Sequence, residues 1–406
     1  MNPNSSLDHL YKKLFAKMVG GLVKSIGIKN ISLAEDAVQE TFLAAQQQWV
    51  KSPPDNPQAW LFKVCKNIAL KLIKEDSPHN NIEDAFHLPS HPDHKEEESA
   101  LNMLLACAHP RFSPKQQVIF ALRYAAGFKV DQIAKILLSQ PETITKTLQR
   151  IKGLIKSEKL ELFATHRVVT TETKNILLNI LYLMFSEGYK TSSGKSILNT
   201  ILCEDALVFT QTIIRNSDLS TPEARALYAL MLFNLSRFEA RFTVDGDLID
   251  LEHQDRTRWN GDMIKVATHS LYESKTNQLS KYHIEGTIAF LHCTASSFEQ
   301  TDWSKIVSLY EQLHLINGSP FIQLNLAIAK FYSGNTEEAV LLMKELGTNI
   351  FIYNYHLYHV AMGKMLNSKN ERPKAIQHYE KAIKLTSHLP EKKYIQNLME
   401  NTSYSS

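Results

Sequence analysis

Apolar residues recur at helical spacing along most of the chain. In the stretch SLAEDAVQETFLAAQQQWV they fall three or four residues apart and share one face of a predicted helix: Ala34, Val38, Phe42, Ala45 and Trp49. The alternation of apolar and polar residues that is typical of strands is almost absent. Glycine and proline are scarce, at 14 residues each. The pattern predicts an all-α protein.

Boundary residues divide the first part of the chain into three predicted helices, the first over about 7–25. The second begins at Ser32, whose hydroxyl can cap the helix while Glu35, three positions later, completes a capping box. The turn KSPPDN follows, in which Asn56 is a predicted N-cap and Pro57 the first helical residue. The third helix extends to about Lys74.

Residues 77–99 predict a flexible linker, because they are rich in proline, acids and histidine and poor in large apolar side chains. The histidines are irregularly spaced and no cysteine accompanies them, which favours solvated side chains over a metal site: His79, His87, His91 and His94. Helices resume near Ala100. Ser113 and Pro114 predict the start of a further helix, and Gly127 predicts its end.

The stretch VDQIAKILLSQPETITKTLQRIKGLIK holds two short amphipathic segments joined by the tight link LSQ, which is typical of a helix-turn-helix. The second segment has an apolar face: Ile144, Leu148, Ile151 and Ile155. Residue types suited to base edges in the major groove lie opposite this face or at the N-terminal flank of the predicted recognition helix: Glu142, Thr143, Thr145, Lys146, Gln149 and Arg150. The alternative is an ordinary hairpin with a solvated basic helix.

Local charge supports contact with nucleic acid. The whole chain has a net charge of only +3, which says little about partners. Between residues 111 and 159, however, ten lysines and arginines stand against three acids. Such a local excess of positive charge is typical of a surface that binds phosphates.

A second basic surface is predicted on the third helix. Its residues recur at three- and four-residue steps, with an aromatic ring at the start: Trp60, Lys63, Lys66, Asn67, Lys71 and Lys74. Aromatic rings beside a cationic groove suit single-stranded bases, where stacking contributes roughly 1–3 kcal/mol per base. For Trp60 alone, a place in the hydrophobic core is the competing interpretation.

The last third of the chain carries a repeat signal. The stretches NTEEAVLLMKEL and ERPKAIQHYEKAI set Ala339 and Ala375 in matching positions about one tetratricopeptide period apart, and an apolar helix precedes each. We therefore expect a helical solenoid with tetratricopeptide-like repeats near 320–400. One β-hairpin is expected earlier, in RFTVDGDLIDL, with Asp245 and Gly246 as its two-residue turn.

Length and composition limit the class of protein that the chain can be. A chain of 406 residues is long enough for two or three domains. The cysteines form no ligand pattern and predict buried free thiols: Cys65, Cys107, Cys203 and Cys293. No signal peptide and no long apolar run is present, so we expect a cytoplasmic protein that does not enter a membrane. We predict no enzymatic activity, no cofactor and no bound metal.

Three of these motifs together resemble bacterial sigma factors of the extracytoplasmic-function type. AEDAVQETFLAAQQQW, NPQAWLFKVCKNIALKLI and TITKTLQRIKGLI follow the order and spacing of that family over about the first 160 residues. The resemblance implies region 2 over 1–76, the linker over 77–99, region 4 over 100–162 and a C-terminal extension over 163–406. The sequence departs from the family pattern at Ala44, at residues 46–48 and at Lys71.

The resemblance also implies partners. Asp36, Gln39 and Glu40 would bind the clamp helices of the RNA polymerase β′ subunit. The third helix would melt and hold the −10 element of promoter DNA. The helix over 142–156 would read the −35 element, while its domain binds the β flap.

The extension resembles that of the sigma-factor subgroup with a helical C-terminal domain, which is thought to take part in controlling activity. The resemblance leaves open whether a regulatory partner binds to this C-terminal extension. The resemblance is strongest in the stretch LFNLSRFEARFTVDGDLIDLEHQDRTRWN. Six of its residues predict a structural or regulatory core: Arg237, Arg241, Asp245, Asp255, Arg256 and Trp259. The carboxylates nearby fit no calcium loop, so ion pairs with those arginines are favoured over a metal: Asp247, Asp250, Glu252 and Asp255.

Two other function classes stay open. A one-component helix-turn-helix regulator would bind duplex DNA without polymerase and sense a ligand or partner through its helical C-terminal domain. That hypothesis leaves the acidic and basic surfaces of the first 76 residues unexplained. A scaffold protein built on the repeats would bind no DNA at all.

Overall fold

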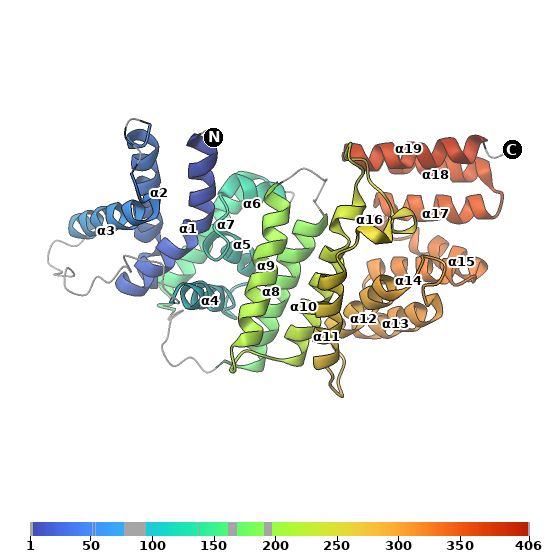
Figure 1. Cartoon of the computed structure of the whole chain (residues 1–406), viewed down its shortest axis with the longest axis horizontal. Helices are drawn as coiled ribbons and strands as arrows, with labels where there is room; N and C mark the ends of the chain where they lie inside the picture. Colours follow the sequence, from blue (N-terminus) through green and yellow to red (C-terminus); the bar gives the residue numbers. More distant parts are fainter. Residues whose placement is uncertain are drawn as a thin grey trace. The chain divides into compact units, whose positions relative to one another are not determined.

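The structure, a computed structural model, describes residues 3–50, 52, 54–76, 95–137, 139–160, 169–190 and 197–404. These residues form nineteen α-helices with short 3-10 turns and no β-strand (Figure 1). The expectation of an all-α protein is therefore confirmed. Among the described residues, no helix combines the length and the apolar character needed to cross a membrane.

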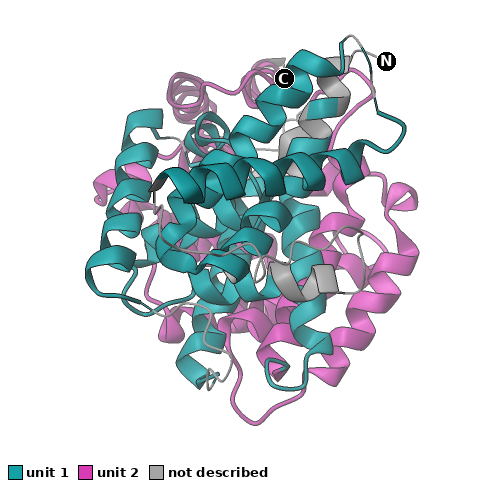
Figure 2. Ribbon diagram, turned by 90° about the vertical axis from the view of Figure 1, so that its left-hand side faces the viewer, with its two compact units in different colours: residues 1–191, 198–220 teal, residues 192–197, 221–406 magenta. Residues whose placement is uncertain are grey.

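The chain forms two compact units (Figure 2). Unit 1 comprises residues 1–191 and 198–220, and unit 2 comprises residues 192–197 and 221–406. The helices α8 (Thr171–Lys190) and α9 (Ile197–Arg215) thus belong almost entirely to unit 1, and α8 packs against α4 and α5. The sequence-based domain boundary after residue 162 falls inside this unit.

Unit 1 begins with α1 (Pro3–Ile26), a 3-10 turn (Ile28–Asn30), α2 (Ile31–Gln48) and α3 (Pro57–Asp76). Helix α2 packs against both α1 and α3. The predicted cap of α3 is confirmed, since the Ala59 amide donates to Asn56 Oδ1 at 3.0 Å. The predicted capping box of α2 is wrong. That helix begins at Ile31 with no side-chain cap, and Glu35 is buried in the interior instead.

The second part of unit 1 contains α4 (Lys95–Cys107), α5 (Pro114–Tyr124), α6 (Val130–Ile136) and α7 (Pro141–Ser157). Helix α4 begins inside the predicted linker, while residues 77–94 and their histidines lie outside the described residues. The predicted start of α5 is confirmed by a capping box between Ser113 and Gln116. After α5, Gly127 adopts a φ of +74°, a left-handed conformation that favours glycine.

Unit 2 begins with α10 (Pro222–Ser236), α11 (Gly261–Glu273), α12 (Lys281–Thr294) and α13 (Trp303–Ile316). It continues with α14 (Pro320–Tyr332), α15 (Thr336–Leu346), the single turn α16 (Ile350–Tyr353), α17 (His356–Ser368), α18 (Arg372–Leu385) and α19 (Leu389–Tyr404). From α12 to α15 and from α17 to α19, each helix packs against the next one in sequence, and α17 also packs against α14 and α15.

The two stretches that carry the repeat signal form matching helix pairs, α14–α15 and α17–α18. Ala339 and Ala375 are both fully buried in one shared hydrophobic core. The second pair is close-packed at Gly363, where a Cβ atom would overlap the ring of Tyr379. Small residues at these positions allow the paired helices to approach each other closely.

The predicted β-hairpin is not formed as two strands. The turn closes through one antiparallel bridge between Phe242 and Leu248, and Gly246 has a φ of +85°. A 3-10 turn precedes the bridge (Phe238–Arg241), and two others follow it (Leu251–His253 and Arg256–Arg258). These turns use the backbone on both sides of the bridge, so the two segments do not pair further as strands.

Candidate nucleic-acid and polymerase surfaces

Helix α7 has a buried apolar face and an exposed polar face. The predicted inward residues are all buried: Ile144, Leu148, Ile151 and Ile155. The predicted base-reading residues are all exposed: Glu142, Thr143, Thr145, Lys146, Gln149 and Arg150. Together with α6, the helix packs as the second element of a short helical pair. Polar side chains able to reach base edges thus lie together on one uncovered helix face.

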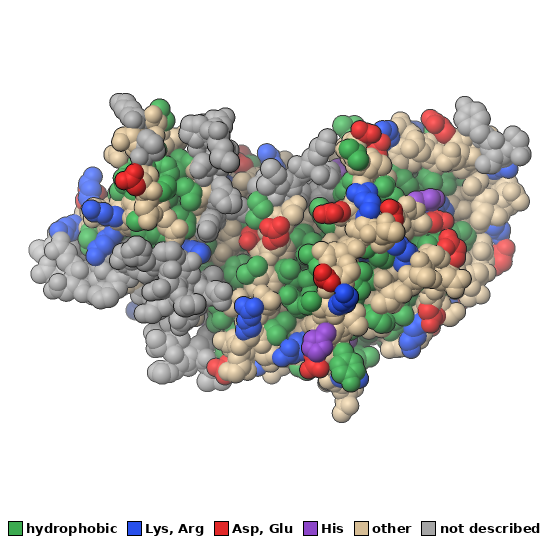
Figure 3. All heavy atoms as spheres, in the orientation of Figure 1, with side chains coloured by type: hydrophobic (Ala, Val, Ile, Leu, Met, Phe, Trp, Pro, Cys, Tyr) green, Lys and Arg blue, Asp and Glu red, His purple; other side chains and the backbone are tan. Residues whose placement is uncertain are grey.

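The basic residues of α3 lie mostly in solvent. Lys63, Asn67 and Lys71 are exposed at steps of four residues, Lys74 is exposed as well, and Lys66 is half-buried. Figure 3 shows lysine and arginine side chains gathered over this part of unit 1. The nearest acid to Lys71 is Glu75, with an N–O distance of 3.9 Å between two exposed side chains. Such a pair is weak in water, so the stripe keeps its positive charge.

Trp60 is half-buried, and its ring meets that of Trp49 edge-on, with centroids 5.5 Å apart. Contacts of this kind stabilise aromatic pairs beyond their buried area. The ring therefore has a packing role in unit 1 and is not a freely exposed platform. A role in stacking on DNA bases stays a prediction.

The residues expected to bind polymerase share the exposed face of α2. Asp36, Gln39 and Glu40 are exposed, whereas Ala37 and Val38 between them are buried. Desolvation raises the pKa of Asp36, and the nearby Lys152 ammonium opposes that effect. The acidic face is accessible to a partner.

Beside this face lies a cluster that the sequence did not reveal. The buried carboxylate of Glu35 accepts hydrogen bonds from Arg123 Nε at 2.8 Å, Tyr124 Oη at 2.7 Å and Lys152 Nζ at 2.8 Å. These donors belong to α5 and α7, whereas Glu35 belongs to α2. We call these four residues the Glu35 network. It joins the helix with the acidic face to the helix with the candidate base-reading residues.

Electrostatics hold the Glu35 network in its charged form. Burial alone would raise the pKa of Glu35, but the positive charges of Arg123 and Lys152 outweigh it and lower the pKa to about 2. The guanidinium also donates to Phe128 O at 2.9 Å and lies over the ring of Phe15, 4.1 Å from its centroid. The buried charge is therefore paired and hydrogen-bonded on several sides.

One signal in the sequence could have pointed to this network. Arg123 lies in VIFALRYAAGF, where its neighbours are apolar and buried. An arginine inside a buried helix needs an acid nearby, because an unpaired buried charge is strongly destabilising. The partner is 88 residues away in sequence, so its identity could not be read from local spacing.

In unit 2, three of the six predicted signature residues pack together. Arg237 and Arg256 flank the buried ring of Trp259, with their guanidinium carbons 6.0 and 4.5 Å from its centroid. Arg256 Nη1 also donates to the backbone oxygens of His292 and Ala295, at 2.8 Å each. Three of the six residues thus form a packed structural centre. Of the other three, Arg241 ends the 3-10 turn before the bridge, Asp255 caps the turn that contains Arg256, and Asp245 is exposed.

Three of the four carboxylates pair with lysines of later helices and not with the arginines that the sequence suggested. Asp250 and Glu252 both bind the ammonium of Lys364 from α17, at 2.8 and 3.2 Å, and Asp247 pairs with Lys393 from α19. Asp255 caps a 3-10 turn by accepting from the Thr257 amide. Asp250, Glu252 and His253 place potential metal-binding atoms within 4.8 Å of one another, but the Lys364 ammonium already lies against both carboxylates.

Comparisons with known proteins cover most of the chain. A family of unknown function, DUF6596, matches residues 174–275. A protein of Rhizobium meliloti (strain 1021), named Uncharacterized protein R00370, is 30% identical over 381 residues, which are 90% of this chain and 89% of that protein. The chain belongs to the family of that Rhizobium protein. This likeness extends over both units, whereas the DUF6596 match begins after α7. No solved structure matches the chain.

The buried cysteines agree with the sequence-based expectation. All four are free thiols inside the fold. Burial raises the pKa of Cys65 to about 12, and a nearby Thr41 hydroxyl opposes that rise. Such thiols are protonated at neutral pH and act as small apolar residues.

Proposed function

We propose that the chain is a sigma factor of the extracytoplasmic-function type, which binds core RNA polymerase and directs it to promoters. The observation that carries the proposal is the division of α7, whose apolar residues are buried while all six candidate base-reading residues are exposed. Helix α3 adds a separate basic surface, and α2 adds an exposed acidic one. A sigma factor needs these three surfaces at once.

In this proposal the protein performs no covalent chemistry. Lysines of α3 contact phosphates near the −10 element, and α7 reads bases of the −35 element. Phosphate contacts supply affinity that falls with salt, whereas base contacts supply sequence preference. The acidic face of α2 binds the polymerase, which synthesises the RNA. The helical extension, with its tetratricopeptide-like pairs, regulates this activity.

The Glu35 network adds a conformational requirement. It holds α2, which has the acidic face, against α5 and α7 within unit 1. In this proposal α3 and α7 contact two separate promoter elements, so the contacts of the Glu35 network open when the chain binds polymerase and DNA.

Transcription with purified core polymerase tests the proposal. The full chain is incubated with core and a library of random promoters, and the transcripts are sequenced. We expect initiation at sites that share two short elements, and loss of the upstream element's signal with Arg150→Ala. Lys305→Ala, an exposed lysine of unit 2, serves as the matched control.

The same materials separate the one-component regulator from the sigma factor. A gel shift is run with and without core polymerase on the selected sequences. Retention that requires core supports the sigma factor. Tight, specific retention by the chain alone would favour the regulator, and no initiation from any library member would overturn the proposal.

A further inference from the structure

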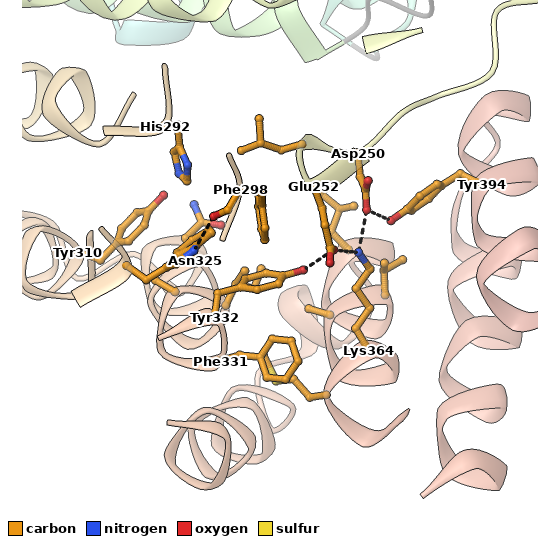
Figure 4. A pocket seen from close by; sticks show the side chains of 18 of the residues that line it. Asp250, Glu252, His292, Phe298, Tyr310, Asn325, Phe331, Tyr332, Lys364 and Tyr394 are labelled. Atoms are coloured by element: carbon orange, nitrogen blue, oxygen red, sulfur yellow. Dashed lines mark hydrogen bonds and ion pairs between the residues drawn. The ribbon is translucent and has the colours of Figure 1, made fainter. Parts of the chain in front are cut away.

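Unit 2 contains a cavity of about 330 Å³ between the chain segment around Asp250 and the helices α12, α13, α14, α17 and α19 (Figure 4). That volume is at the low end of the range for small-molecule sites, about 300–1,000 Å³. The cavity lies wholly within one compact unit. None of the proposed DNA-binding or polymerase-binding surfaces involves it, so its role is independent of the proposed function.

The wall of the cavity is mainly apolar and largely aromatic. The rings of Trp303 and Tyr332 stack with centroids 4.9 Å apart, and Phe298 meets them edge-on at 5.0 and 4.8 Å. Aliphatic side chains of α14 and α17 complete the lining, including Ile328 and Val360. Because the rings hold one another in place, the cavity is pre-formed and fits a flat apolar body.

One end of the cavity carries net negative charge. Lys364 Nζ lies 2.8 Å from Asp250 Oδ2 and 3.2 Å from Glu252 Oε2, and Tyr394 and Tyr332 also bind these carboxylates. We call these five residues the Lys364 network. Two carboxylates thus face a single ammonium, and no other formally charged side chain lines the cavity as described.

Within the Lys364 network, one acceptor atom stays available. Asp250 is saturated, with His253 and the backbone on Oδ1 and with Lys364 and Tyr394 on Oδ2. Glu252 receives both of its donors, Tyr332 and Lys364, on Oε2, and its Oε1 has no partner among the described residues. That oxygen is the free acceptor of a carboxylate whose charge is only partly compensated, because Lys364 is shared with Asp250.

Polar side chains gather at the opposite end of the cavity, as Figure 4 shows. In the described part of the chain, the side chains of His292, Tyr310 and Asn325 make no hydrogen bond to the protein. Burial, followed by the charges of Arg237 and Arg256, lowers the pKa of His292 to about 3, so its ring is neutral. A neutral imidazole, a phenol and an amide can bind a hydroxyl group as donors and as acceptors.

We propose that this cavity binds a small aromatic amine that carries a hydroxyl group. The ammonium binds Glu252 Oε1, the aromatic body packs against the rings of Trp303 and Tyr332, and the hydroxyl lies among His292, Tyr310 and Asn325. The negative end excludes the carboxylate analogue of such a molecule. Each end of the ligand satisfies a group that the protein leaves without a partner.

Calorimetry on the full chain with three probes of similar size tests the inference. Tyramine has both polar groups, phenethylamine lacks the hydroxyl, and 3-(4-hydroxyphenyl)propanoate replaces the amine with a carboxylate. We expect tyramine to bind with one site per chain and phenethylamine to bind roughly 3–10-fold more weakly, since a neutral hydrogen bond is lost. The carboxylate should show no binding heat.

Substitutions in the cavity test whether the probes bind there. Glu252→Gln should weaken both amines at least about tenfold, because a charge-assisted hydrogen bond is lost. Ala361→Trp, which places a large side chain in the cavity, should abolish binding. The control is Glu337→Gln, which removes an exposed carboxylate paired with Lys369 in the same unit. Circular dichroism establishes that each variant is folded.

Three results would overturn the inference. One is equal binding of the carboxylate and the amine. Another is unchanged affinity for tyramine in folded Glu252→Gln or Ala361→Trp. The last is the absence of binding by every probe.

Discussion

Arg123 and Glu35 form an ion pair that is almost completely removed from solvent, with 4% and 9% of their side chains exposed, and it joins α5 to α2. Pairs of this kind need not stabilise a fold relative to an apolar core, because burying both charges has a large desolvation cost. Removing one partner alone destabilises the fold strongly, because it leaves the other charge buried and unpaired. This asymmetry makes the contribution of the pair measurable.

We predict that Glu35→Gln lowers the free energy of unfolding of unit 1 by about 3–5 kcal/mol, because Arg123 and Lys152 lose their shared counter-charge. Replacing Glu35 and Arg123 together with methionine should recover much of the loss. Hydrogen exchange of α2 and α5 in rising urea measures both effects, because Trp259 and Trp303 of unit 2 would also contribute to tryptophan fluorescence. Glu40→Gln, an exposed acid of the same helix, is the control. Equal unfolding midpoints for the two single variants would contradict the prediction.

The pH dependence of unit 1 follows from the same carboxylate. Burial acts to raise the pKa of Glu35, but Arg123 and Lys152 lower it from 4.5 to about 2 in the folded state. The folded state thus binds fewer protons than the unfolded state in this range, so the stabilisation is complete above pH 4.5 and is lost as the pH falls toward 2. Urea unfolding between pH 6 and pH 2.5 should show this loss in the natural chain. In the double methionine variant the slope should be shallower, and an identical slope would exclude Glu35 as its source.

The local patterns of unit 1 were predictable and its long-range contacts were not. The faces of α7 and the cap at Asn56 follow from residues within one or two turns, and the structure shows them as expected. Glu35 fitted a local capping pattern equally well, but its burial against Arg123 overrode that pattern. Helical periodicity places a residue on a face and does not say which distant helix covers that face.

Arg150 and Lys71 should differ in how they affect DNA binding. Arg150→Ala should change the preferred sequence at one position and weaken binding there by about 1–3 kcal/mol. Lys71→Ala should weaken binding to all sequences and reduce the slope of affinity against salt concentration by about one unit. Fluorescence anisotropy with holoenzyme on selected promoters, at several salt concentrations, measures both.

The exposed lysine Lys305 of unit 2 is the matched control for those DNA measurements. Its alanine variant should change neither sequence preference nor salt slope. Equal, sequence-independent losses for Arg150→Ala and Lys71→Ala would count against α7 as the recognition helix.

The acidic face of α2 should be needed for binding polymerase. Asp36→Arg reverses an exposed charge, so we expect it to abolish co-purification with core polymerase while circular dichroism stays unchanged. Because Lys152 lies near Asp36, Glu40→Arg serves as a second variant at a greater distance from the Glu35 network. Glu337→Arg in unit 2 controls for the change in net charge. A folded Glu40→Arg protein that still binds core as tightly as the natural chain would remove this face from the proposal.

Unit 2 shows the same limit of sequence reasoning. The repeat signal located the helix pairs, because buried small residues such as Ala339 and Ala375 recur at matching positions. The acids near residue 250 were assigned to arginines close by in sequence. Lys364 binds two of them instead, from more than 110 residues away. Pairing between charges depends on how successive helices fold back, which local spacing does not encode.

Two glycines inside helices should respond in opposite ways to the same substitution. At Gly363 of α17, an added Cβ would overlap the buried ring of Tyr379, so Gly363→Ala should destabilise unit 2 by about 1–3 kcal/mol. At Gly153 of α7, nothing lies within 4 Å of an added Cβ, so Gly153→Ala should stabilise that helix by about 0.5–1 kcal/mol through its higher helix propensity. Hydrogen exchange resolved by segment follows the opening of each helix separately, which a single unfolding curve of a two-unit chain does not. Faster exchange in α17 of the first variant and slower exchange in α7 of the second are expected. If Gly363→Ala also slowed exchange in α17, the close contact between α17 and α18 would not be what requires glycine there.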